Sequence, residues 1–148
     1  MDSGRVLMGN NRSVNLFTEK EKDTMEMEFY RCSHCGQIVE VVKGTGVPMM
    51  CCGEKMQKLE PGTTDGALEK HVPVVEVSGN TVTVTVGSVI HPMLEAHYIQ
   101  WIALLTKQGF QRKNLAPGEE PKAVFALAEG DEFVAAYEYC NLHGLWKA

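Results

Sequence analysis

The amino-acid sequence predicts an all-β chain in which a small metal-bound domain is followed by an antiparallel β-sandwich. Three observations support this prediction. Four of the five cysteines lie between residues 32 and 52, in a segment too short to bury a core of its own. Residues 67–148 contain several short segments rich in β-branched and aromatic residues, separated by turn residues. One of these segments, residues 81–86, alternates strictly between threonine and valine, as a half-buried strand does.

The composition is that of an ordinary soluble globular protein. Of the 148 residues, 44% are hydrophobic and 22% are charged, and this length suits either one ordinary domain or one small and one medium domain. No apolar run is long enough for a transmembrane helix, and the start of the chain lacks the apolar segment of a signal peptide. We therefore expect a cytoplasmic protein with no membrane partner. The net charge of −5 argues against a nucleic-acid surface, and it means that an anionic substrate would need a local positive group.

The chain divides into three parts and a linker. Residues 1–26 contain a mixed-charge run and no core-forming period, so we expect a disordered extension. Residues 27–62 hold the clustered cysteines and a β-rich run at 38–42. A concentration of turn residues at 60–66 indicates a linker, and residues 67–148 form the sandwich domain.

Short strands account for most of the sandwich domain. We expect them at residues 74–77, 81–86, 97–105, 110–115, 123–128 and 133–139. Ser78-Gly79-Asn80 between the first two is a hairpin signal. In residues 81–86 the valines should face a core and the threonines solvent. The one hint of a helix is a single turn at Pro92–Ala96. Strands at this spacing favour an antiparallel sandwich of roughly seven strands.

The first ligand set consists of four sulfurs. Cys32-x-x-Cys35 places two thiolates on a tight turn closed by Gly36, and a cation would relieve their mutual repulsion. The second pair, Cys51 and Cys52, is adjacent, so both sulfurs reach one metal only if the backbone is locally distorted. A structural zinc site and disulfides are the alternatives, and the odd cysteine count argues against a complete disulfide framework. The residues alone leave iron and zinc both open at this site.

The second ligand set combines four of the five histidines with the remaining cysteine: His71, His91, His97, Cys140 and His143. Pro92 favours an extended His91, so that the chain can turn and aim both His91 and His97 inward. Four nitrogens and one sulfur exceed the four ligands of a structural zinc site, and they favour a redox-capable metal, iron before copper. Five protein ligands leave one open position in an octahedron. A purely structural cluster is the alternative, and the fifth histidine, His34, is expected in an exposed loop.

Taken in order, these motifs resemble those of desulfoferrodoxin, the two-iron form of superoxide reductase. The matching motifs are Cys-x2-Cys-x15-Cys-Cys, Glu-Lys-His-Val-Pro, His-Pro-Met-x3-His and Cys-Asn-x-His, which span about residues 27–148. The resemblance implies a desulforedoxin-like first domain with a distorted rubredoxin-like iron on its four cysteines. It also implies that the sandwich is immunoglobulin-like, with a second iron that the four histidines surround equatorially and Cys140 binds axially.

The resemblance further implies an activity. The reaction would be the one-electron reduction of superoxide to hydrogen peroxide, with no oxygen released. The electron donor would be a rubredoxin-like protein, and the chain would form a homodimer. The four-cysteine iron would relay or store an electron, and it need not be essential because the catalytic ligands all lie after residue 66.

Two charged residues precede the first histidine of the second set. Lys70 would place an ammonium group near the open position, where at ~4 Å an opposite charge is worth roughly 4 kcal/mol at an effective dielectric near 20 and about 1 kcal/mol in water. In the family, the carboxylate matching Glu69 can occupy the open position of the oxidised iron, where it would help displace the product. A solvated lysine and an exposed strand-edge glutamate are the alternatives.

A non-catalytic metal-binding or electron-carrier protein is the competing interpretation. The open ligand position and the run Glu69-Lys70-His71 favour the enzyme, because neither storage nor structure needs a lysine beside the metal. A dismutase, which would also oxidise superoxide, is a third possibility.

Overall fold

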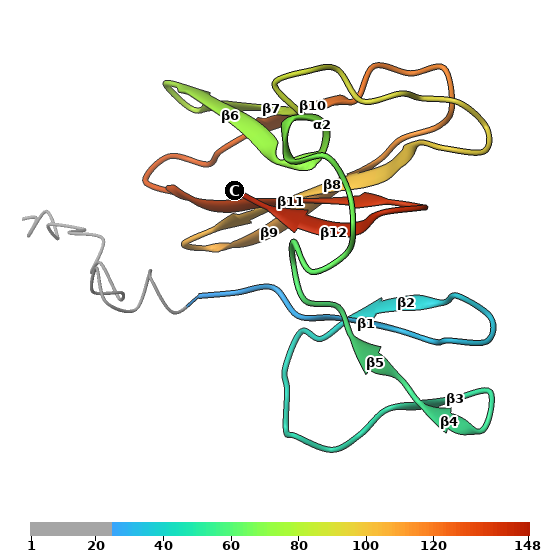
Figure 1. Cartoon of the computed structure of the whole chain (residues 1–148). Coiled ribbons are helices and arrows are strands. Elements are labelled where there is room, and N and C mark those ends of the chain that lie inside the picture. The colour runs from blue at the N-terminus through green and yellow to red at the C-terminus, as the bar shows by residue number, and fades with distance from the viewer. Residues whose placement is uncertain (1–24) are drawn as a thin grey trace, which may run out of the picture.

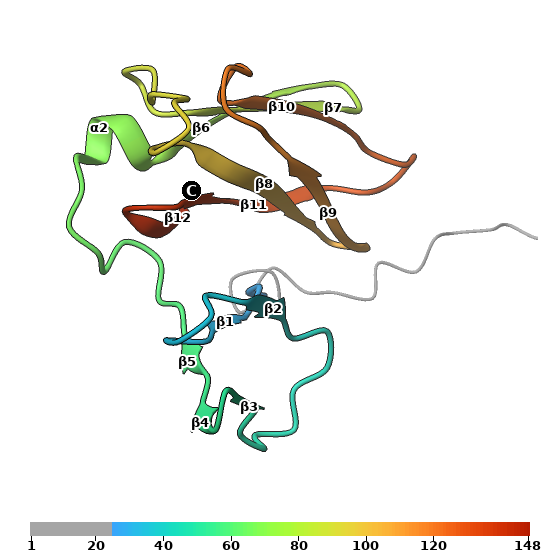
Figure 2. The same cartoon turned by 90° about the vertical axis from the view of Figure 1, so that its right-hand side faces the viewer.

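The computed structural model describes residues 25–148, and nearly all of its regular structure is β-strand. Two units lie one above the other in Figures 1 and 2: an N-terminal unit of strands β1 to β5, and a sandwich unit that begins at helix α2 and contains β6 to β12. The disordered extension predicted for residues 1–26 lies outside the described residues, apart from its last two. None of the helices in the described part is long and apolar enough to cross a membrane.

The N-terminal unit is built from very short strands. Its main sheet has the order β2-β1-β5, formed by Ile38–Glu40, Phe29–Arg31 and Gln57–Lys58. A separate ribbon pairs β3 (Met50–Cys51) with β4 (Glu54–Lys55). Strands of two or three residues bury little apolar surface, which agrees with the expectation that a metal completes this unit.

The sandwich unit has seven strands in two antiparallel sheets, in agreement with the sequence prediction. The first sheet has the order β10-β7-β6, formed by Lys122–Ala126, Thr81–Val86 and Pro73–Ser78. The second has the order β12-β11-β8-β9, formed by Gly144–Lys147, Phe133–Cys140, Ile99–Thr106 and Gly109–Asn114.

The core of the sandwich lies between the two sheets. As the alternation in residues 81–86 predicts, Val82, Val84 and Val86 are fully buried, whereas Thr81 is exposed. The valines pack against residues of the second sheet such as Ile102. The predicted hairpin at residues 78–80 joins β6 to β7.

One local prediction is wrong, and two short elements were not predicted. Residues 92–96 do not form a helical turn; they lie in a loop closed by a bridge between Leu94 and His97. The short helix is α2, Leu68–His71, which has a single turn and is therefore too short to produce a periodic pattern in the sequence. Strand β12 was also missed, because its four residues fall below the length at which alternation is visible.

The N-terminal unit covers the outer face of the second sheet. Phe29 of β1 is buried against Trp101 of β8, with ring centroids 4.8 Å apart, and against Tyr137 of β11 at 5.9 Å. The backbone N–H of Met27 donates a 3.1 Å hydrogen bond to the Tyr137 hydroxyl. A second apolar core, shared by the two units, therefore holds them together.

The predicted linker is packed against the sandwich unit. The N–H of Gly62 donates a 2.9 Å hydrogen bond to the carbonyl of Leu145. At Gly66, a Cβ atom would lie 3.1 Å from the Trp146 ring and 3.2 Å from the His71 ring. The segment between the two units therefore forms part of the wall behind His71.

Candidate metal centres

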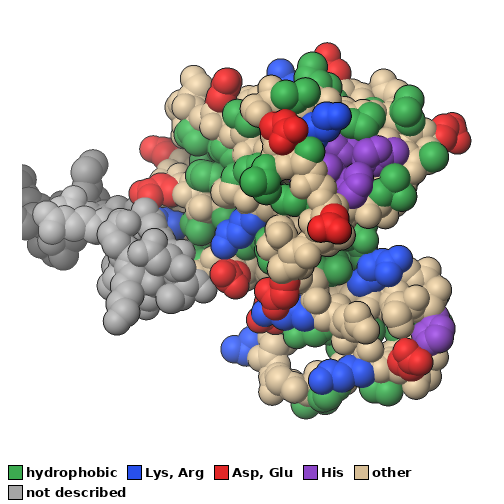
Figure 3. All heavy atoms as spheres, in the orientation of Figure 1, with side chains coloured by type: hydrophobic (Ala, Val, Ile, Leu, Met, Phe, Trp, Pro, Cys, Tyr) green, Lys and Arg blue, Asp and Glu red, His purple; other side chains and the backbone are tan. Residues whose placement is uncertain are grey.

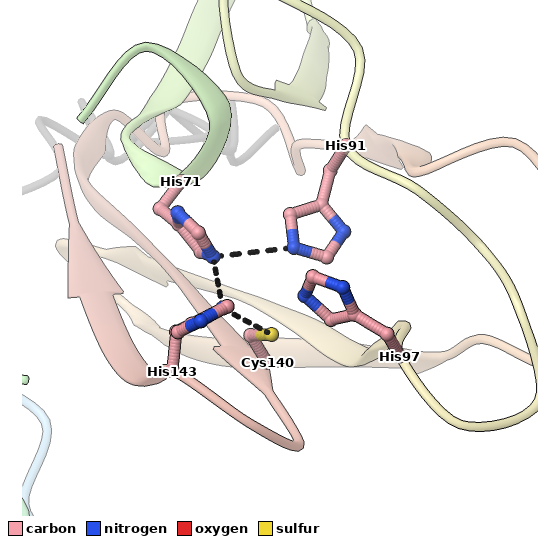
Figure 4. A group of neighbouring side chains, drawn as sticks. All are labelled: His71, His91, His97, Cys140 and His143. Carbon is pink, nitrogen blue, oxygen red and sulfur yellow. Dashed lines mark hydrogen bonds between the residues drawn. The ribbon is translucent and has the colours of Figure 1, made fainter. Parts of the chain in front are cut away.

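The five predicted ligands of the second set converge at one end of the sandwich unit (Figure 4), and their ligand atoms all lie within 4.8 Å of one another. His71 ends α2, and His91 and His97 lie on the loop between β7 and β8. Cys140 is the last residue of β11, and His143 lies in the turn before β12. The sequence thus identified the whole cluster, although its elements are far apart along the chain.

Backbone carbonyls orient two of the imidazoles. The Nδ1–H of His71 donates to the Ala67 carbonyl at 2.8 Å, and the Nδ1–H of His91 donates to the Pro92 carbonyl at 2.6 Å. These bonds fix the tautomer in which Nε2 carries no proton and is free to bind a metal. In both residues, that Nε2 atom points into the cluster.

The spacing of the ligand nitrogens matches a metal site. His71 Nε2 lies 3.2 Å from His91 Nε2 and 3.0 Å from His143 Nδ1. For a metal–nitrogen bond of about 2.1 Å, neighbouring nitrogens at a right angle lie about 3.0 Å apart. The Nε2 of His97 is buried and has no hydrogen-bond partner within residues 25–148. A cation among these nitrogens would satisfy all of them.

Burial keeps the cluster in the form that binds a metal. Desolvation lowers the pKa of His71, of His97 and of His91, the last to about 4, and the neighbouring imidazoles lower them further. These rings are therefore neutral at pH 7. Burial raises the pKa of the Cys140 thiol, against the backbone N–H groups of Leu142 and His143, which lower it. A metal would favour the thiolate, because metal binding and loss of the thiol proton are linked.

Two residues with no predicted role as ligands, Trp146 and Asn141, support the ligand set. Trp146 stacks on His71, with centroids 5.0 Å apart, and its indole N–H donates to the His143 carbonyl at 3.0 Å. Asn141 accepts from the Tyr98 N–H and donates to the Ala96 carbonyl, both at 3.0 Å. Asn141 thus ties the histidine loop to the turn after β11. Its place in the motif Cys-Asn-x-His was the one signal that pointed to it.

The loop after β7 packs closely against α2 at Gly87. Gly87 has a φ of +84°, and a Cβ atom there would lie 2.4 Å from the Val89 carbonyl oxygen and 2.8 Å from that of Glu69. The Glu69 carbonyl also accepts the Val89 N–H at 2.9 Å. The loop after β7 therefore fixes the helix that carries Glu69, Lys70 and His71, and it requires glycine at this point.

Glu69 and Lys70 are both exposed on this helix, so Glu69 does not lie at a strand edge. The charge of Lys70 lowers the pKa of His71 and His97, and the charge of Glu69 raises that of His71. Both charges are thus close enough to act on the ligand set. Figure 3 shows histidine side chains at the surface of the sandwich unit, with cationic and acidic side chains at the border of this patch.

The four cysteines of the first set also converge, with their sulfurs within 4.8 Å of one another. Cys51 Sγ lies 3.7 Å from Cys35 Sγ and 3.9 Å from Cys52 Sγ. A metal–sulfur bond of about 2.3 Å gives tetrahedral edges of about 3.8 Å. All five cysteines are free, so the disulfide alternative is not supported. Cys52 has a φ of +53°, which is the local distortion expected for an adjacent pair.

The thiols of this set cannot all ionise together without a cation. A hydrogen bond from the Cys35 backbone lowers the pKa of Cys32 to about 6. Hydrogen bonds among the sulfurs, that with Cys32 first, raise the pKa of Cys51 to about 12. His34 is exposed and lies 3.0 Å from a Glu54 carboxylate oxygen, so it is not a ligand, as predicted.

Two family profiles together match nearly all of the described chain. The profile of the desulfoferrodoxin N-terminal domain matches residues 24–59, and that of desulfoferrodoxin matches residues 63–148. The chain belongs to the desulfoferrodoxin family. It is 52% identical over 123 residues to the desulfoferrodoxin of Nitratidesulfovibrio vulgaris, covering 83% of this chain and 96% of that protein. It is 50% identical over 125 residues to a desulfoferrodoxin homolog of Archaeoglobus fulgidus, covering 84% and 98%.

A solved structure agrees with this assignment. The superoxide reductase from Treponema pallidum is 41% identical, with a TM-score of 0.71 over 84% of this chain and 99% of that one. Within the family, the four-cysteine group and the group of four histidines with Cys140 fit two iron sites.

Proposed function

We propose that the chain is a superoxide reductase that converts superoxide to hydrogen peroxide by one-electron reduction, without releasing oxygen. The observation that carries the proposal is the convergence of four imidazoles and one thiol at the end of the sandwich unit. When bound there, iron would supply the electron and an open coordination position. The protein holds the imidazoles neutral and oriented, and it leaves Lys70 and Glu69 exposed beside them.

Lys70 would attract superoxide to the site. The net charge of −5 repels an anion at long range, so a local cation is needed. The Lys70 charge already acts on His71 and His97. Because the side chain is exposed, solvent weakens its attraction, and salt should weaken it further.

Glu69 would act after the electron has been transferred. Glu69 lies beside Lys70 on the same short helix, and its carboxylate would approach the open position and help displace the product. Glu69→Ala should leave superoxide capture fast and change the absorption spectrum of the oxidised site. A large fall in the capture rate would count against this role.

The remaining functional assignments follow the family resemblance. We infer that the four-cysteine iron of residues 27–62 relays or stores an electron, and that residues 67–148 carry the reaction. A rubredoxin-like protein would supply the electrons. The protein would act as a homodimer in the cytoplasm, as part of the defence against oxidative stress.

The deciding experiment measures peroxide formed per superoxide consumed, by stopped flow on iron-loaded, prereduced protein. A yield near one means reduction, and a yield near one half means dismutation. No acceleration of superoxide loss, with iron confirmed at both sites, would favour a non-catalytic electron carrier instead.

A further inference from the structure

Two turns from separate sheets supply the sulfurs of the four-cysteine site. The first turn joins β1 to β2 and carries Cys32 and Cys35. The second joins β3 to β4 and carries Cys52, with Cys51 directly before it. Because β3 and β4 form a ribbon of their own, strand pairing within residues 25–148 does not join this ribbon to the β2-β1-β5 sheet. Side-chain contacts therefore decide how firmly the two turns face each other.

The backbone of the second turn places Glu54 beside the sulfurs. Cys52 and Gly53 have φ values of +53° and +77°, as the two central residues of a type I′ hairpin turn do. This hairpin pairs Glu54 directly with Cys51. Side chains at a paired position lie on the same face of a ribbon, so the Glu54 carboxylate lies on the face from which Cys51 approaches the other sulfurs.

The Glu54 carboxylate contacts both residues that separate the cysteines of the first turn. Its Oε2 accepts a 3.3 Å hydrogen bond from the Ser33 hydroxyl, and its Oε1 lies 3.0 Å from His34 Nε2. Each of these contacts is exposed to water and is weak by itself. One carboxylate makes both, however, so ordering a single side chain joins the two turns at two points.

We propose that Glu54 is a positioning residue of the four-cysteine site, with two effects on the metal held there. Its carboxylate holds the two cysteine turns together, which slows release of the metal. Its negative charge beside the sulfurs disfavours the reduced iron site, which is more negative than the oxidised site by one charge. Iron at this site would therefore give up its electron more readily than it would without Glu54.

The second effect deepens the proposed function and rests on it, because it matters only if iron at this site supplies an electron for the reaction. The first effect concerns metal binding alone and does not depend on superoxide chemistry. Both can be measured without turnover, so their outcome is separate from that of the activity measurement.

Glu60 provides a matched control. It is a glutamate of the same unit, and its side chain is 59% exposed, against 60% for Glu54. Its carboxylate lies 3.8 Å from Lys58 Nζ. Substitutions of Glu60 therefore remove an equally exposed carboxylate and leave the contacts between the two cysteine turns in place.

The first experiment measures iron release from the full-length, two-iron protein in excess EDTA, followed by the absorbance of the four-cysteine iron. Glu54→Ala should release this iron severalfold faster than wild type, and Glu60→Ala should not. In a Ser33→Ala/His34→Ala background, Glu54→Ala should add little, because its partners are already gone. Equal release from wild type and Glu54→Ala, or an undiminished Glu54 effect in that background, would overturn the positioning role. If Glu54→Ala does not retain iron, Glu54→Gln replaces it in the same comparisons.

The second experiment equilibrates the four-cysteine iron with a one-electron dye and uses Glu54→Gln, which keeps the side-chain shape and removes the charge. The ratio of oxidised to reduced dye at half reduction should rise about two- to threefold, since water screens the lost charge. Glu60→Gln should change it less. A purely structural role would leave the ratio unmoved, and that result would overturn the charge effect. Absence of superoxide reduction by wild type, with both Glu54 effects present, would refute the proposed function and leave the role of Glu54 intact.

Discussion

Replacement of Glu138 by glutamine should stabilise the protein at neutral pH. Glu138 is fully buried on β11, where it pairs with Ile102 and Trp146 on the neighbouring strands. Side chains alternate along a strand, so it shares the face of Ala136 and Cys140, which point into the sandwich core. Neither carboxylate oxygen has a hydrogen-bond partner among the described residues. Burial raises the pKa of this carboxyl from 4.5 to about 9.

The sign of the effect follows from the proton balance. At pH 7 the folded protein keeps the carboxyl protonated, whereas the unfolded chain ionises it. Unfolding therefore releases a proton, and stability falls as the pH rises from 4.5 to about 9. At about 1.4 kcal/mol per pH unit, the cost at pH 7 is about 3 kcal/mol. Glutamine has a similar shape and does not ionise, so Glu138→Gln should recover about this amount.

Chemical denaturation of zinc-loaded wild type and variant at pH 5 and pH 7 tests this. The difference between the two proteins at each pH removes the pH dependence that comes from all other titrating groups. The gain should be under about 1 kcal/mol at pH 5 and near 3 kcal/mol at pH 7. Glu76→Gln, at an exposed position on β6, should show no such trend. An equal gain at both values, or none at pH 7, would refute the reasoning.

Three further predictions concern the site and the packing around it. Lys70→Gln should slow superoxide capture about fivefold at low salt in stopped-flow measurements, and the gap should close as salt is raised; an effect independent of salt would exclude an electrostatic role. Gly87→Ala should lower the free energy of unfolding by at least about 2 kcal/mol and disturb the absorption of the five-ligand iron. Gly130→Ala, with a φ of +83° but open space around it, should cost less and leave the spectrum unchanged; equal effects would mean that crowding at Gly87 is unimportant. Phe29→Ala should cost about 3–5 kcal/mol in chemical denaturation, because the side chain is buried between the two units; a change near zero would show that the units are not held by this contact.

The candidate ligands could be predicted from the sequence because cysteine and histidine are few in this chain and some of them lie close together in pairs. Cys32 and Cys35 share one turn, and Cys140 and His143 share another, so each pair is visible without knowledge of the fold. The alternation in residues 81–86 revealed a strand for the same reason, since the pattern lies within the strand itself.

The supporting residues could not be predicted because their roles depend on distant partners. Asn141 is needed because the Tyr98 N–H and the Ala96 carbonyl lie beside it, more than forty positions away in sequence. A buried carboxyl such as Glu138 runs against the usual preference of its residue type, so no pattern indicates it. The short helix α2 depends on the loop at Gly87, which holds it from outside.

The core shared by the two units has a consequence for biosynthesis. Met27 bonds to Tyr137, 110 positions later in the chain. A ribosome releases the N-terminal unit first, but the aromatic surface that Phe29 packs against is complete only after β11 has emerged. Contacts this distant slow folding and leave apolar surface exposed in the meantime. The N-terminal unit is therefore synthesised first but completes its packing late. A metal bound early by its cysteines would stabilise its fold until β11 is available.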